Sequence, residues 1–111
     1  MEIKQYEIFW VDLEPTQGAE INKIRPRVII SPNEMNENIK TLIIAPMTTN
    51  GRVYPTRVEV LFQGKVGYII LDQIKSLNKS RLRSKAGMLD NEAILKVKSI
   101  IKELLVDGIS F

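Results

Sequence analysis

The apolar runs of this chain are short, and most of them stop at or near a proline or a glycine. Five of them are dense in β-branched and aromatic residues, which is typical of strands. These runs cover residues 7–12, 27–31, 41–45, 56–62 and 66–71. The residues that punctuate them are Pro15, Pro32, Pro46 and Gly64. Because such residues end strands or make turns, the spacing predicts a sheet of short antiparallel strands.

The segment before the C-terminus has a helical period instead. Asp90 is a predicted N-cap, and apolar residues then recur every three or four positions, opposite a face rich in lysine. The apolar positions are Ala93, Ile94, Val97, Ile100, Ile101, Leu104 and Leu105. Gly108 is expected to end the helix. We expect the apolar face to pack in the core.

Alternating cations mark the segment 79–85, between the predicted sheet and the helix. Arg81, Arg83 and Lys85 are spaced as on an exposed strand edge. Charges there either keep the edge from pairing with other molecules or bind phosphates, and both interpretations stay open. With this segment, six short strands and one terminal helix predict a mainly β fold, a small and strongly bent sheet with the helix packed across it. The polar run 33–38 is expected to form a turn or a short helix.

Composition limits the chemistry that the chain can carry. A chain of 111 residues predicts a single domain over residues 1–111. It has no cysteine and no histidine, which excludes disulfides, thiolate and imidazole catalysis, and metal sites made of these residues. We expect no metal and no cofactor. The net charge of +3 permits a polyanionic partner without requiring one.

The apolar runs also bear on where the protein acts. All of them are shorter than the ~18 residues that a membrane helix needs, and the first residues lack the basic-then-apolar order of a signal peptide. We therefore expect a cytoplasmic protein without membrane contact.

A guanidinium and two hydroxyls are expected to meet at one end of the sheet. Pro26 favours an extended conformation at Arg25, which fixes the direction of that side chain. Thr48 and Thr49 follow the next strand, and antiparallel neighbours bring the start of one strand beside the end of the other. An arginine fork and a hydroxyl together suit the oxygens of a phosphodiester. The simpler alternatives are a surface arginine in a loop and threonines in a turn.

Several blocks of the sequence resemble, in order, those of the MazF/PemK toxin family. They read WVDLEPTQGAEINKIRPRVIISP, APMTTN, YPTRVEV and GYIILDQIKSL. The resemblance implies a small SH3-like barrel of the MazF/PemK/CcdB type with a C-terminal helix, and a homodimer. It also implies metal-independent, sequence-selective cleavage of single-stranded mRNA that leaves a 2′,3′-cyclic phosphate and a 5′-hydroxyl. A cognate acidic antitoxin is the implied partner, which we expect to lie across the groove near Arg25.

The same resemblance assigns roles to residues. Arg25 falls on the family's catalytic arginine, Thr48 on its catalytic threonine, and Glu20 on an acidic loop position that makes it a candidate base. One branch of the family uses an arginine two residues before an aspartate; Asp72 matches that aspartate, but Ile70 stands at the arginine position, which favours the Arg25 and Thr48 pair. The expected supporting or RNA-binding residues are Glu20, Thr49, Asp72, Gln73, Lys75, Arg81 and Arg83.

Two other functions are compatible with this fold. The gyrase-poisoning toxins share the barrel, have no nuclease activity and act through the end of the terminal helix, and the apolar ending 109–111 is the one feature that favours them here. An inactive RNA- or protein-binding barrel is the other alternative.

Base recognition is expected from loops and aromatic side chains. We expect the loops 17–24 and 50–55 to read bases, and Tyr54, Phe62 or Trp10 to stack on bases if exposed. Trp10 and Phe62 are more often core residues in apolar strands. The stretch 59–64 matches a viral protease recognition site used in expression tags; we interpret it as native strand sequence that needs no functional account.

Overall fold

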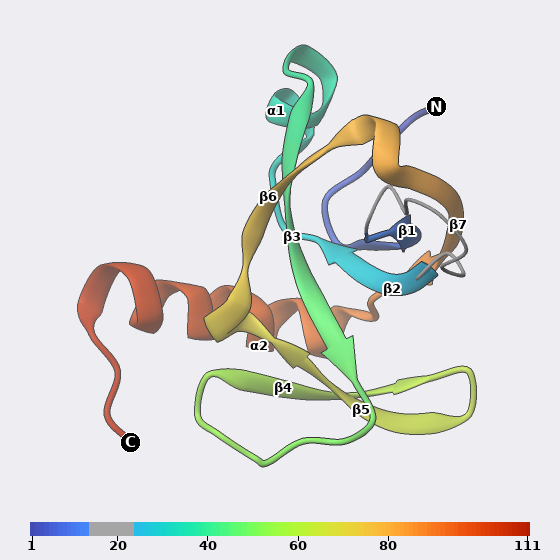
Figure 1. Cartoon of the computed structure of the whole chain (residues 1–111). Helices are drawn as coiled ribbons and strands as arrows, with labels where there is room; N and C mark the ends of the chain where they lie inside the picture. Colours follow the sequence, from blue (N-terminus) through green and yellow to red (C-terminus); the bar gives the residue numbers. More distant parts are fainter. Residues whose placement is uncertain (14–23) are drawn as a thin grey trace.

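The computed structural model describes residues 1–13 and 24–111, and these form a curled seven-stranded antiparallel sheet with a helix packed against it (Figure 1). The strands are β1 (Glu7–Asp12), β2 (Ile24–Ile29), β3 (Thr41–Thr48), β4 (Arg57–Phe62), β5 (Lys65–Ile70), β6 (Lys75–Asn78) and β7 (Leu82–Met88). The helices are α1 (Asn33–Asn38), the short helix expected there, and α2 (Asn91–Lys102). This architecture confirms the predicted mainly β fold with a C-terminal helix. In the described part of the chain, no helix is long and apolar enough to cross a membrane.

Strand β3 is the centre of the sheet and has three neighbours. It pairs with β2 along one edge, and on the other edge its first half pairs with β6 while Met47 and Thr48 pair with β5. Figure 1 shows β3 running from α1 down to the β4–β5 hairpin. Because its two halves have different neighbours, the sheet curls into a half-barrel and the end of β3 lies between β2 and β5.

Two apolar clusters fill the two sides of this curled sheet. The cluster under α2 combines Ile8, Val28, Ala45, Val58, Ile69 and Leu71 with Leu89, Ala93 and Val97. The cluster inside the curl is made of Ile3, Phe9, Val11, Ile29, Leu42, Ile44, Leu77 and Leu82. Alternate residues of β1 and β2 belong to different clusters, as the period of two in a strand requires.

Helix α2 begins and ends where the sequence predicts. The side chain of Asp90 accepts a hydrogen bond from the backbone N–H of Ala93 at 2.8 Å, and Gly108 has a φ of 94° just after the helical residues. The predicted apolar face is wrong at its end, because Leu105 is 61% exposed. The last turn, Glu103–Asp107, is a wider π turn, which breaks the 3.6-residue period and rotates Leu105 away from the sheet.

Several strand boundaries differ from the prediction, and one strand was not predicted. Strand β3 does not stop at Pro46 but continues to Thr48; Pro46 lies between the β6 ladder, which ends at Ile44, and the β5 ladder, which begins at Met47. A missing N–H is tolerated at such a gap. Strand β2 starts at Ile24, so Arg25 lies within a strand. Strand β6 was not predicted, because its four residues contain a single apolar side chain.

The basic segment forms the predicted strand edge from Leu82 onward, whereas Arg81 lies in the turn before the strand. After a 3₁₀ turn at Lys79–Arg81, β7 occupies one end of the strand order and pairs with β1.

Candidate active site

Arg25 and Thr48 line the same groove. The register pairs Arg27 with Pro46 and Val28 with Ala45, so following both strands outward leads to Arg25 on β2 and Thr48 at the end of β3. The groove has a volume of about 350 Å³. We call it the site groove; its lining is Arg25, Pro26, Met47, Thr48, Thr49, Phe62, Gln63, Lys65 and Gly67.

The polar groups of the site groove are suited to an anion. Its lining contains two cations, Arg25 and Lys65, the hydroxyls of Thr48 and Thr49, and one side-chain amide. Among residues 1–13 and 24–111, no carboxylate belongs to the lining. Apolar walls beside cationic and hydroxyl groups are the combination that holds a phosphate together with an attached ring.

Thr48 is held by a local turn and by a close packing contact. Its Oγ1 donates to the carbonyl of Asn50 at 2.8 Å and accepts from the N–H of Asn50 at 3.1 Å. A Cβ added to Gly67 would lie 2.8 Å from the backbone oxygen of Thr48. The turn chemistry expected of this threonine is therefore present, and the turn itself fixes the hydroxyl at the edge of the site groove.

Arg25 is exposed, and within the described part of the chain one hydrogen bond occupies its guanidinium. Its Nη1 donates to the carbonyl of Ile24 at 3.0 Å. Arg27, two residues further along β2, is half-buried; burial and then the charge of Arg25 lower the pKa of its guanidinium. Among the described residues, no carboxylate lies within ion-pair distance of either arginine. The acidic candidate Glu20 lies outside the described residues.

Asp72 is not part of the lining but belongs to a cluster beside Thr48. Its Oδ1 accepts from Thr56 Oγ1 at 2.8 Å and from Arg57 Nε at 3.2 Å. A methyl group built on Gly51 would contact Thr48 Cγ2 at 3.2 Å and Arg57 Nη1 at 3.4 Å. The Arg57–Asp72 pair is therefore separated from Thr48 by little more than the width of that methyl group.

Sequence reasoning missed Arg57. Its guanidinium binds Asp72, the aspartate for which the sequence offers Ile70 instead of an arginine two residues earlier. Arg57 lies opposite Ile70 in the β4–β5 ladder, and its guanidinium lies 4.6 Å from the centre of the Tyr54 ring. Only the register of the two strands brings it to Asp72. No spacing within the sequence indicates this contact.

Asp72→Asn is expected to destabilise the protein at neutral pH and to do so less as the pH falls into the acid range. Burial raises the pKa of Asp72, but hydrogen bonds from Arg57 and Thr56 outweigh it, so the folded pKa lies below the ordinary value. A depressed pKa contributes stability above the unfolded value of about 3.9, and that stability is lost as the pH falls through the folded pKa. Because the pair is partly exposed, the loss at pH 7 should be below about 1 kcal/mol. Urea unfolding at pH 7 and pH 3 measures it, and an equal loss at both would contradict the assignment.

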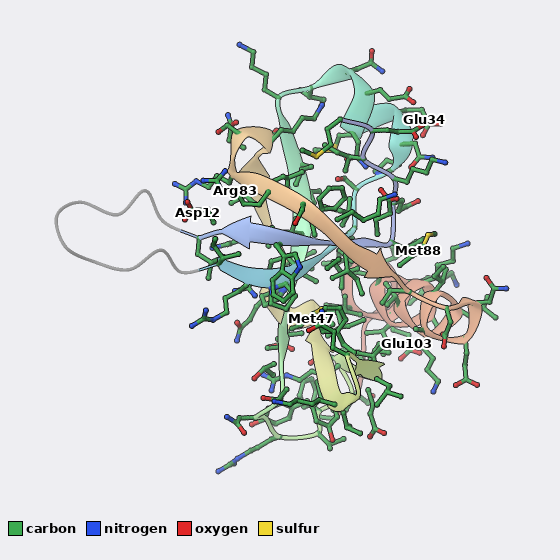
Figure 2. All side chains as sticks on the ribbon, turned by 90° about the vertical axis from the view of Figure 1, so that its right-hand side faces the viewer. Asp12, Glu34, Met47, Arg83, Met88 and Glu103 are labelled. Atoms are coloured by element: carbon green, nitrogen blue, oxygen red, sulfur yellow. The ribbon has the colours of Figure 1, made fainter. Side chains whose placement is uncertain are left out.

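The remaining residues predicted to support the site or bind RNA lie elsewhere. Gln73 and Lys75 are exposed near the start of β6, outside the lining of the site groove. Arg83 Nη2 binds Asp12 Oδ2 at 2.6 Å, and Figure 2 shows the two side chains together at the end of β1. Arg81 donates to the carbonyl of Leu13, and Lys85 pairs with Glu7.

These contacts fasten β7 to β1. They favour the edge-strand interpretation of the basic segment over phosphate binding, because the partners of all three cations are within the chain.

The aromatic residues divide between packing and the site groove. Trp10 and Phe62 are half-buried and pack edge to face, with ring centres 6.0 Å apart. Phe62 also lines the site groove, whereas Tyr54 lies against Arg57 and Phe111. Within residues 1–13 and 24–111, no three carboxylates gather closely enough to hold a metal ion.

Comparisons with known proteins agree with this geometry. Residues 4–105 match the family model of the PemK-like, MazF-like toxin of type II toxin–antitoxin system. The endoribonuclease toxin MazF of Escherichia coli (strain K12) is 32% identical over 100 residues, which cover 89% of this chain and 90% of that protein. The endoribonuclease MazF of Staphylococcus epidermidis is 32% identical over 105 residues, covering 89% and 88%.

Solved structures show the same fold at lower identity. A mycobacterial endoribonuclease in complex with its cognate antitoxin superposes with a TM-score of 0.80 at 21% identity, over 97% of this chain and 99% of that one. MazF of Deinococcus radiodurans gives a TM-score of 0.76 at 22% identity, over 95% and 97%. The chain belongs to the PemK/MazF family of type II toxin–antitoxin toxins.

Proposed function

We propose that this protein is the toxin of a toxin–antitoxin pair and acts as a metal-independent endoribonuclease on single-stranded mRNA. The observation that carries the proposal is the site groove, where the Arg25 guanidinium and the Thr48 hydroxyl line one pocket together with Lys65. Relatives that are 32% identical over most of the chain are named endoribonucleases, which supports the same activity here.

The proposed reaction is a transesterification within the RNA. The 2′-oxygen attacks the neighbouring phosphorus and loses its proton, the bond from phosphorus to the 5′-oxygen breaks, and that oxygen takes up a proton. The products are a 2′,3′-cyclic phosphate and a 5′-hydroxyl. The Arg25 fork binds the two non-bridging phosphate oxygens and stabilises the charge that develops on them. The Thr48 hydroxyl, whose single proton turns from the Asn50 carbonyl, donates to an ester oxygen.

Proton transfer places different demands on the residues. An arginine side chain stays protonated at any pH at which the enzyme works, so Arg25 cannot act as a base. It can donate a proton to the leaving 5′-oxygen. The base that accepts the 2′-proton is assigned to Glu20, on the strength of its place in the sequence.

A single strand fits the site groove better than a duplex. The volume of about 350 Å³ is near the lower end for small-molecule pockets and suits about one nucleotide. Bases in a duplex are stacked and paired, whereas an unpaired base can enter a groove and stack on an aromatic wall such as Phe62.

The proposal is tested by incubating the purified chain with a long RNA in EDTA. We expect discrete cleavage, with 5′ ends that a kinase labels without prior phosphatase treatment, as a 5′-hydroxyl requires. Cleavage only after Mg²⁺ is added would contradict metal independence. No cleavage under either condition would overturn the nuclease and leave the two non-catalytic alternatives, a gyrase-poisoning toxin and an inactive binding barrel.

Two partners belong to the same proposal. A homodimer would cover apolar side chains such as Leu61, Met88 and Leu95, which are 73%, 55% and 66% exposed. Light scattering of the same preparation should give twice the 12.7 kDa of the chain, and a monomer would exclude the dimer. An acidic antitoxin segment would pair with Arg25 and Lys65, so adding the cognate antitoxin should stop cleavage in the EDTA assay.

A further inference from the structure

The tip of the β4–β5 hairpin forms one wall of the site groove in an unusual conformation. Phe62 pairs with Lys65, so only Gln63 and Gly64 make the turn. Their φ angles are 50° and 78°, the pattern of a type I′ turn. Glycine adopts such angles without strain, and the other position normally holds asparagine, aspartate or glycine. Glutamine is a poor choice there on conformational grounds.

Packing does not explain the glutamine. Gln63 is exposed, so it fills no space in the core. Gln63 lines both the site groove and a second cavity of about 390 Å³ between β4, β7 and α2. A non-glycine residue held at positive φ costs conformational energy, and such residues concentrate at functional sites. A strained, exposed amide between two cavities is therefore a candidate for ligand contact.

Lys65 adds a charge on the side of Thr48 away from Arg25. Strands β2 and β5 flank β3 on opposite edges, so the two cations of the site groove stand on either side of the end of β3. Lys65 is exposed, and among the described residues no carboxylate lies within ion-pair distance of it. A strand of RNA with one phosphate at Arg25 and Thr48 would carry a neighbouring phosphate toward Lys65.

We propose that the hairpin tip, residues 63–65, is an RNA-binding element of this toxin. Lys65 binds a phosphate next to the scissile one, as a compact point charge suited to a phosphate in any orientation. Gln63 offers both a donor and an acceptor to the edge of an adjoining base and is a specificity-determining residue. The inference rests on the proposed function and extends it. It also gives a role to part of the stretch 59–64, for which the sequence alone suggested none.

The lysine is tested by Lys65→Gln, with Lys40→Gln as the matched control. Lys40 is exposed and precedes β3 at the end opposite Thr48. Binding of a single-stranded RNA with 2′-deoxy substitution at the cleavage site is followed by fluorescence anisotropy in EDTA over a range of salt concentrations. Lys65→Gln should weaken binding several-fold and reduce the slope of log affinity against log salt by about 1, equally for all sequences. Lys40→Gln should leave both the affinity for RNA and the salt slope near the wild-type values.

The glutamine is tested by Gln63→Gly and Gln63→Asn. Both residues accept positive φ better than glutamine, so both variants should unfold at a higher temperature than wild type. Sequencing the 5′-hydroxyl ends from a long RNA should show that Gln63→Gly relaxes the base preference at one position beside the cut, and that Gln63→Asn, with its shorter amide, retains part of it.

The outcomes separate this inference from the proposed function. An unchanged cleavage profile in Gln63→Gly together with unchanged binding in Lys65→Gln would overturn the inference. If the wild type cuts no RNA but Lys65→Gln still weakens RNA binding, the nuclease proposal fails and the hairpin tip stands as an RNA-binding element.

Discussion

Arg25→Ala is expected to lose nearly all RNA cleavage, and Arg25→Lys most of it. Lysine restores the charge but not the two parallel donors that match a phosphate. One preorganised donor to a developing oxyanion is typically worth ~10²–10³ in rate, and a residue that also gives up a proton should be worth more. Cleavage of an oligonucleotide that contains the preferred site, measured as kcat/KM in EDTA, tests this.

The stability of the Arg25 variants should stay within about 0.5 kcal/mol of wild type, because the side chain is exposed and, among the described residues, bonds only the carbonyl of Ile24. Arg83→Ala is the matched control. It is expected to lose stability but to keep cleavage activity. It leaves the carboxylate of Asp12, whose side chain is 11% exposed, without its guanidinium partner, which should cost about 1–3 kcal/mol. Its folded fraction should still cut RNA. If Arg25→Ala cut at the wild-type rate while Asp72→Ala did not cut, the chemistry would lie at the Arg57–Asp72 pair instead.

The sequence predicts those parts of the site that depend on local order. Proline after Arg25 and the run of β-branched residues before Thr48 determine where each residue sits on its strand, and antiparallel pairing of neighbours then brings the two residues to the same end of the sheet. The cap at Asp90 and the stop at Gly108 are local in the same sense.

Contacts that depend on strand register or distant pairing were not predictable. Arg57 reaches Asp72 only because it lies opposite Ile70, and a shift of one residue would turn it to the other face of the sheet. Arg83 finds Asp12 across 71 positions of sequence. The spacing of Arg81, Arg83 and Lys85 in the sequence is therefore compatible both with an edge strand and with phosphate binding. Their partners in residues 7–13 decide between the two.

Gly67→Ala is expected to reduce cleavage about a hundredfold, although Gly67 has no side chain that could act on RNA. The added Cβ would lie 2.8 Å from the backbone oxygen of Thr48, closer than carbon and oxygen can approach. A backbone atom cannot swing aside as the end of a side chain can, so β3 and β5 must separate where Thr48 is held. Overpacking of this kind costs about 1–3 kcal/mol. A displacement of about 1 Å at a catalytic group costs ~10²-fold in rate.

Gly108→Ala separates the loss of rate from the loss of stability. Gly108 has a φ of 94° and open space around its Cβ position, so alanine there is strained but touches nothing near Thr48. Both variants should unfold at lower temperature, whereas only Gly67→Ala should lower kcat at temperatures where both proteins are fully folded. Equal kcat in the two variants would mean that β5 can move without displacing Thr48. The catalytic position of Thr48 would then depend on its own turn with Asn50 and not on the packing of glycine against its carbonyl.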